Sequence, residues 1–186
     1  MTATLDGRTI AQRVSARFAD AVEAAEPGWL RVRAERLVDV VRFLRDEPEL
    51  TLEQLDMMTA VDYMDYFELV YLLLSVRRNH QCLLKCWTGD RADPAVPSLV
   101  PVLYGALLQE RETYDLFGIR FADHPDLRRV LLWEGFAGWP LRKDFLQIGQ
   151  GAFHPGLPHF PKEGGERGLL TGPNWTGEDA AQELNQ

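Results

Sequence analysis

Apolar side chains recur every three to four residues in three stretches of the chain, which is the spacing of an amphipathic helix. The first helix is predicted over residues 7–24 and stops at Pro27-Gly28, a pair typical of turns. The second is predicted over residues 34–46, ahead of Pro48. The third is predicted over residues 99–117, with Gly118 as the residue that closes it.

The middle of the chain has a different texture, with β-branched, aromatic and leucine side chains gathered in short runs. A polar Arg77-Arg78-Asn79 separates two of these runs and indicates a hairpin turn, which favours strands over a leucine-rich helix there. The pattern predicts strands over residues 29–32, 56–62, 66–76 and 80–88. We expect a loop over 89–97, extended segments over 119–121 and 130–133, and a single turn over 125–129.

The last forty residues differ in composition from the rest. Glycine and proline make up 12 of residues 147–186, so this segment cannot offset its ordering entropy alone, although it carries scattered apolar side chains. We therefore predict one α+β domain over residues 1–146, with a small, mostly antiparallel or mixed sheet packed by helices. Residues 147–186 are predicted to be an extended tail that lies on partner proteins.

Charge and cysteine content exclude several classes. A formal net charge of −8 argues against nucleic-acid binding, which needs clustered Lys and Arg. Cys82 and Cys86 would stand too far apart on one strand to form a disulfide, and indicate packed thiols in a reducing compartment. The start of the chain lacks the apolar core of a signal peptide, and no apolar run reaches the ~20 residues that span a bilayer.

The candidate chemistry begins in the run ERETYDLFG. Glu110, Arg111, Glu112 and Asp115 fall within six residues of the third predicted helix. Arg111 and Asp115 are four residues apart, so we expect them to face each other, whereas Glu112 points elsewhere. Carboxylates can do acid–base work, but no nucleophile accompanies these. The alternatives are a solvated helix face and a buried or interfacial ion network.

Downstream, two basic pairs stand within reach of these acids. Arg128 with Arg129 and Arg142 with Lys143 could hold phosphate, but we expect them to pair with carboxylates of this chain or its neighbours. Asp144 follows directly and neutralises part of their field. The predicted network comprises Glu110, Arg111, Glu112, Asp115, His124, Arg128, Arg129, Arg142, Lys143 and Asp144.

Other kinds of site find little support. His124 beside a proline is typical of a structural histidine, and His154 and His159 have neither cysteine nor carboxylate near them to complete a metal site. No phosphate-binding glycine motif, zinc-protease motif or nucleophile elbow is present. A stand-alone enzyme would need Glu112, Asp115 and His124 to converge in a pocket. The residues alone favour a scaffold or interaction subunit that has no catalytic or metal-binding residues.

The run ERETYDLFGIRFADHPDLRRVLL, followed by GWPLRKDF, resembles the signature region of the thirty-kilodalton subunit of respiratory complex I, which is the C subunit of bacterial NADH:quinone oxidoreductase. The match extends over residues 110–145. TAVDY (59–63), FELVYLLLSV (67–76) and VPSL (96–99) also resemble the family. Together they cover about half of the chain, whereas the first 50 residues and the tail match only in kind.

The resemblance implies both a fold and a role. It implies helices against a small mixed sheet with a C-terminal extension over neighbouring subunits. It implies a subunit of the peripheral arm, close to the quinone-reducing module. Its neighbours there would be the forty-nine-kilodalton, D-type subunit and the B-type subunit that carries the terminal iron–sulfur cluster. It further implies that iron–sulfur clusters, FMN and quinone belong to partner subunits, that this chain binds no cofactor, and that the complex holds it at the cytoplasmic face of the cell membrane.

The sequence departs from the family pattern at several places. Ala106-Leu107-Leu108 stands where Ala-Asn-Trp is usual, Trp133 where proline is common, and Leu146 where proline usually follows. These departures indicate a divergent branch and leave the electron donor open. The alternative is the equivalent subunit of a ferredoxin-, deazaflavin- or hydrogen-fed membrane complex.

Overall fold

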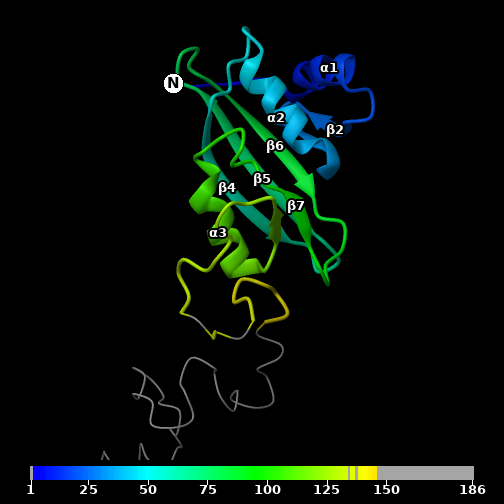
Figure 1. The fold of residues 1–186 in the computed structure, drawn as a ribbon. Coiled ribbons are helices and arrows are strands. Elements are labelled where there is room, and N and C mark those ends of the chain that lie inside the picture. Colours follow the sequence, from blue (N-terminus) through cyan, green and yellow to red (C-terminus); the bar gives the residue numbers. More distant parts are fainter. Residues whose placement is uncertain (1, 134, 137, 146–186) are drawn as a thin grey trace, which may run out of the picture.

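A mixed sheet of six strands forms the centre of the computed structural model, which describes residues 2–133, 135–136 and 138–145 (Figure 1). The main strand order is β2-β3-β6-β5-β4, and β1 pairs with β6. Antiparallel pairing joins β4 to β5, β5 to β6 and β2 to β3, whereas β3 and β1 run parallel to β6. The strands are β1 Ala3–Thr4, β2 Val22–Glu26, β3 Trp29–Val32, β4 Gln54–Asp62, β5 Phe67–Ser75 and β6 His80–Trp87.

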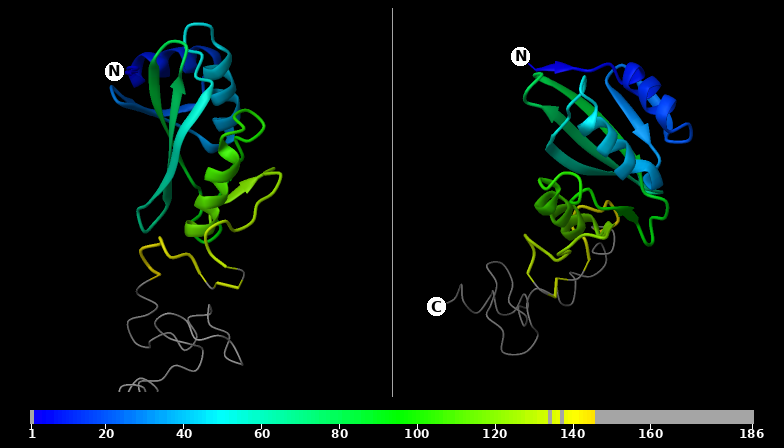
Figure 2. Two further views of the ribbon diagram at one scale, coloured as in Figure 1. Left: turned by 90° about the vertical axis from the view of Figure 1, so that its left-hand side faces the viewer. Right: turned by 45° about the horizontal axis from the view of Figure 1, so that its top comes forward.

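Three α-helices and one short 3₁₀ helix accompany the sheet. They are α1 Gly7–Arg17, η1 Ala34–Arg36, α2 Leu37–Asp46 and α3 Ala106–Phe117. Asp6 caps the N-terminus of α1, and its carboxylate accepts the Thr9 N–H at 3.0 Å. The left view of Figure 2 shows α2 and α3 on the same side of the sheet. Two short parallel strands, β7 Ala95–Pro97 and β8 Arg120–Ala122, form a second sheet that flanks α3.

The core lies between the helices and one face of the main sheet. Strand β6 alternates buried and half-buried residues along its whole length, so one face packs inward and the other lies outward. The inward residues of β6 are paired in register with inward residues of β5, as in Tyr71 with Leu84 and Leu69 with Cys86. Cys82 and Cys86 are therefore free core thiols, and burial raises the pKa of each to about 12.

The α+β fold class is confirmed, and so are the predicted strands, whose observed ends lie within two residues of expectation. The predicted helix over 34–46 is present as η1 and α2. Gly118 closes α3 in the left-handed conformation, as predicted, with φ at 70°. The predicted tail over 147–186 lies outside the described residues.

Four local predictions are wrong. The first helix ends at Arg17, because residues 22–26 instead pair with β3 and Val22 stands in register with Val32. Helix α3 starts only at Ala106, after turns that hold Pro101 and Gly105. The expected loop at 89–97 ends in β7, which pairs with β8. The expected extended segment at 130–133 is a bend, because its N–H groups converge on one carboxylate instead of a neighbouring strand.

Candidate functional site

Asp115 is the centre of a cluster of polar contacts at the end of α3. One oxygen, Oδ2, accepts three successive backbone N–H groups, from Val130 at 3.0 Å, Leu131 at 2.8 Å and Leu132 at 2.9 Å. The other, Oδ1, accepts from Arg129 Nη1 at 2.8 Å. Burial alone would raise the pKa of Asp115, but these hydrogen bonds outweigh it and hold the pKa below its usual range. The carboxylate thus fixes the loop that follows β8.

Arg111, one helical turn before Asp115, also binds the loop that follows β8. Its guanidinium donates to the carbonyl oxygens of Arg128 at 3.1 Å and Arg129 at 3.2 Å, and lies 3.5 Å from Asp126. The expected pairing of Arg111 with Asp115 is therefore wrong within the described residues: the two side chains hold different atoms of one loop. Four-residue spacing placed them on one side of the helix, but the loop offers each a closer partner.

Glu110 lies on the inward side of α3 and is fully buried. Its Oε2 accepts the Ser98 hydroxyl and its Oε1 accepts the Leu99 N–H, both at 2.6 Å. Burial raises the pKa of Glu110 to about 7 despite these hydrogen bonds. The His124 ring stands beside it, with Nε2 4.0 Å from Glu110 Oε2 and 3.1 Å from the Leu107 carbonyl oxygen.

The His124 ring is held by hydrogen bonds to two backbone groups, which is typical of a structural histidine. Nδ1 accepts the Asp126 N–H at 3.0 Å, so the proton of the neutral ring belongs on Nε2, which donates to the Leu107 carbonyl. The side chain is fully buried. These two bonds tie the turn after β8 to the start of α3.

The GWPLRKDF segment docks on the C-terminal end of α3. The Leu141 N–H donates to the Leu116 carbonyl at 3.1 Å, and Arg142 Nε donates to the Phe117 carbonyl at 2.6 Å. The Arg142 guanidinium stacks over the Trp139 ring, 4.1 Å from its centroid. Burial lowers the pKa of Arg142. Within the described residues Arg142 thus binds a carbonyl oxygen and an aromatic ring, not the carboxylate that we expected.

A second centre, at Asp62 and Arg91, was missed in the sequence. Asp62 ends β4 and is nearly fully buried. Its carboxylate accepts hydrogen bonds from both Nη atoms of Arg91, from the Met64 N–H at 2.7 Å and from the Lys143 N–H at 2.9 Å. Burial raises the pKa of Asp62, but these donors together lower it below its usual range. Asp144 lies 3.1 Å from the same Arg91 guanidinium. Asp62 belongs to the TAVDY run, which was the one available signal.

The ten predicted site residues therefore separate into groups. Asp115 with Arg129, and Glu110 with His124, lie in contact around α3. Arg128 is exposed and lies 3.0 Å from Asp126. The side chains of Glu112 and Lys143 are exposed. Glu112, Asp115 and His124 do not converge, because Asp115 faces a loop, His124 faces the core and Glu112 faces outward.

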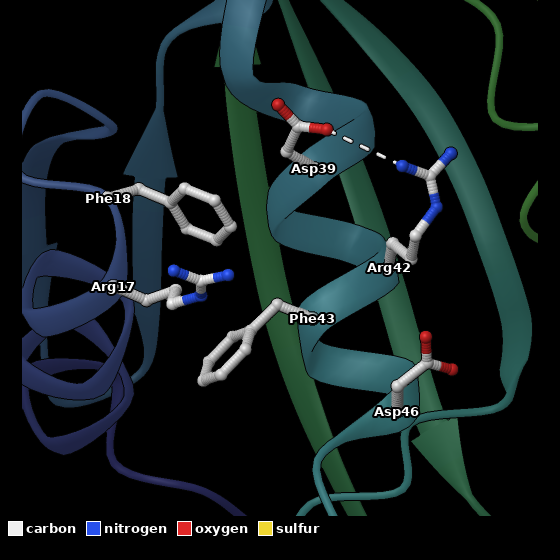
Figure 3. Close-up of a pocket in the computed structure, with 6 residues that line it drawn as sticks. All are labelled: Arg17, Phe18, Asp39, Arg42, Phe43 and Asp46. Atoms are coloured by element: carbon white, nitrogen blue, oxygen red, sulfur yellow. Dashed lines mark hydrogen bonds and ion pairs between the residues drawn. The ribbon is translucent and has the colours of Figure 1, made fainter.

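Few features of the described residues suggest a bound ion or small molecule. No three His, Cys, Asp or Glu side chains in that part of the chain are grouped to hold a metal. A groove of about 360 Å³ lies between the end of α1 and α2, with Phe18 and Phe43 edge to face (Figure 3). Its carboxylates are already paired, since Asp39 lies 3.5 Å from Arg42 and Asp46 lies 2.7 Å from Arg45. None of the described helices is long and apolar enough to cross a membrane.

The family described as "Respiratory-chain NADH dehydrogenase, 30 Kd subunit" matches residues 30–150, which include β3 except its first residue, β4 to β8 and the whole α3 site. The chain belongs to this family. A member from Roseiflexus castenholzii, named as the C subunit of NADH-quinone oxidoreductase, is 45% identical over 147 residues, which cover 75% of this chain and 84% of that protein. The protein of the same name from Brucella ovis is 43% identical over 140 residues, covering 72% of this chain and 68% of that one.

The family's fold also extends to a more distant protein. A chain in the structure of the membrane-bound sulfane sulfur reductase, an archaeal respiratory membrane complex, superimposes with a TM-score of 0.56. The match covers 74% of this chain and 84% of that chain, with 23% sequence identity. At that identity the likeness shows a shared fold and no more. The family match over residues 30–150 includes α3, the loop that follows β8 and the GWPLRKDF segment.

Proposed function

We propose that this chain is a subunit of the peripheral arm of a proton-translocating NADH:quinone oxidoreductase, next to the quinone-reducing module. The observation that carries the proposal is the family match over residues 30–150, together with relatives named as the C subunit of NADH-quinone oxidoreductase. In this role the chain takes part in an oxidoreductase complex and contributes structure to it.

Within that complex, the chain has a structural role and no catalytic or cofactor-binding residues. The contacts of its charged residues support this role. The carboxylates of Asp115 and Asp62 accept hydrogen bonds from backbone N–H groups and from arginines. The Glu110 carboxylate accepts them from the Ser98 hydroxyl and the Leu99 N–H. A carboxylate whose two oxygens both accept hydrogen bonds from its own chain fixes a loop and is not presented to a substrate.

The proposed neighbours are the forty-nine-kilodalton, D-type subunit and the B-type subunit with the terminal cluster, which carry the quinone site and the iron–sulfur cluster next to it. FMN belongs to the NADH-oxidising end of the complex. The chain is held at the cytoplasmic face of the cell membrane through these neighbours. The Gly- and Pro-rich residues 147–186, with their scattered apolar side chains, supply a segment suited to lie on them.

The proposal is tested by purifying the tagged chain from detergent-solubilised membranes of its own host. We expect the D-type and B-type subunits, together with a flavin- and NADH-binding pair, to co-purify, and the eluate to reduce a quinone with NADH. Co-purification with hydrogenase- or ferredoxin-type subunits in place of that pair would favour the alternative donor. Recovery of the chain alone would overturn the proposal.

A further inference from the structure

The loop that follows β8 displays apolar side chains to solvent. Val130 and Leu131 are 43% and 60% exposed, and Leu108, on the neighbouring outward side of α3, is 57% exposed. Surface loops are usually polar, and exposed apolar side chains that gather in one place commonly mark an interaction site. Asp115 lies seven residues after Leu108, on the same side of the helix, and binds the N–H groups of Val130 and Leu131. The three apolar residues thus lie on the surface formed by two adjoining elements, α3 and the loop that its side chains hold.

This surface is fixed from behind by buried polar groups. Three N–H groups of residues 130–132 end on one oxygen of Asp115, and two carbonyl groups just before them end on Arg111. Arg129 donates both to Asp115 and to the Phe136 carbonyl, at 2.8 and 3.1 Å. A loop that is held in this way has already lost its conformational entropy, so binding through its outward side chains costs less.

Glu112 supplies a charge at the edge of the same surface. It lies four residues after Leu108 and three before Asp115, and it is exposed. Within the described residues, no Lys, Arg or His side chain lies within ion-pair distance of Glu112. The other charged residues nearby all have polar partners in this chain, namely Glu110, Arg111, Asp115 and Arg129. A lone carboxylate beside exposed apolar side chains complements a surface that offers one cation in an apolar setting.

We propose that Leu108, Glu112, Val130 and Leu131 form a preformed docking surface for a neighbouring subunit of the oxidoreductase. The surface on that subunit would be an apolar recess that receives Leu131 and carries one Arg or Lys opposite Glu112. This inference rests on the proposed function, because it takes the partner from the same complex. Phosphate, nucleic acid and lipid headgroups are disfavoured partners, since the one charge among these four residues is negative.

Substitution in the assembled complex tests the surface. The host's own copy is replaced by tagged Leu131→Asp or, as a matched control, Val76→Asp. Val76 is also apolar and 64% exposed, but it lies in the β5–β6 turn at the opposite end of the sheet (Figure 1). We expect Leu131→Asp to lower the yield of co-purified neighbouring subunits on the order of tenfold, and Val76→Asp to leave it unchanged. Glu112→Arg should lower the yield, and Glu112→Gln should do so less.

A photo-crosslinking residue at position 131 identifies the occupant without relying on a loss. We expect a covalent product with another subunit of the complex, whose crosslinked peptide is apolar and contains Arg or Lys. A product with a second copy of this chain, or with its own residues 146–186, would overturn the proposal. So would equal yields from Leu131→Asp and Val76→Asp. If the unsubstituted chain recovers no oxidoreductase subunits, the proposed function itself fails, which is a distinct result.

Discussion

Asp62 Oδ2 accepts the backbone N–H of Lys143 at 2.9 Å, although 81 residues separate the two along the chain. Asp62 closes β4, and Lys143 lies in the segment that docks on the end of α3. The same carboxylate binds Arg91, which in turn lies 3.1 Å from Asp144. One buried acid therefore joins the edge of the sheet, the loop before β7 and the last described segment.

Replacing Asp62 with Ala should destabilise the chain strongly. The substitution removes the acceptor of two backbone N–H groups and leaves the largely buried Arg91 guanidinium with only Asp144 as an ion partner within the described residues. Breaking a buried pair from one side costs about 3 kcal/mol or more, or roughly 6–12 °C in Tm for a chain of this size. Thermal unfolding of the full-length chain measures the effect. Asp65→Ala, at an exposed position nearby, should change Tm by little, and equal shifts in both variants would contradict the role of Asp62.

Glu110 should make the free energy of unfolding depend on pH between about 4.5 and 7. Its pKa is raised to about 7 by burial, so the folded chain keeps a proton that the unfolded chain releases above about 4.5. The folded state therefore binds more protons in this range, and its stability falls as pH rises from 4.5 to 7. At about 1.4 kcal/mol for each pKa unit, the total fall attributable to Glu110 is about 3 kcal/mol.

Glu110→Gln removes this titration while keeping an oxygen for the Leu99 N–H and a donor for Ser98. We expect the variant to gain stability relative to the original chain as pH rises, with the change complete by about pH 8. Urea unfolding at pH 5, 6, 7 and 8 gives the comparison. Glu112→Gln, at an exposed position on the same helix, is the control and should show no such gain. A pH-independent difference for Glu110→Gln would refute the assignment.

The strands and helices that were predicted correctly each bury one regular face in the core. In β6 every second residue is buried, and this alternation with a period of two is the sequence pattern that predicts a strand. Residues 18–26 carry no such decisive pattern. Val22 fits the helical spacing of Ile10 and Val14, and only its pairing with Val32 in β3 makes it part of a strand. Tertiary pairing overrode a local pattern there, as it did for the three-residue strand β7.

The charged site could be predicted in composition but not in its pairs. The acids and arginines around α3 and in GWPLRKDF were visible in sequence, yet most of their partners are backbone groups, which every residue carries. The residue types at positions 130–132 do not indicate that their N–H groups bind Asp115. Asp62 and Arg91 were missed because their contacts span 29 and 81 residues, beyond any local spacing rule.

Gly118→Ala should displace Trp139. A Cβ at Gly118 would overlap the Trp139 ring, and the left-handed φ of 70° is itself unfavourable for alanine. Strain and overpacking together should cost about 2–4 kcal/mol. Because the GWPLRKDF segment packs through Trp139, tryptophan fluorescence should change along with Tm. Gly28→Ala has open space around it and should leave both unchanged. Unaltered fluorescence in Gly118→Ala would mean that the ring does not pack there.

Arg91 and Arg142 offer a direct comparison of two arginines that share the Phe67 ring, 4.8 and 5.0 Å from its centroid. Arg91→Met leaves the buried Asp62 carboxylate without its cation, so it should cost about 3 kcal/mol. Arg142→Met strands no carboxylate within the described residues, and it removes a guanidinium whose pKa burial already lowers. It forfeits one hydrogen bond to the Phe117 carbonyl and the stacking on Trp139, or about 1–2 kcal/mol, part of which the Met side chain recovers by packing on the same rings. Chemical denaturation of the two full-length variants should therefore rank Arg91→Met as clearly less stable. The reverse order would mean that a carboxylate outside the described residues pairs with Arg142, as we first expected from the sequence.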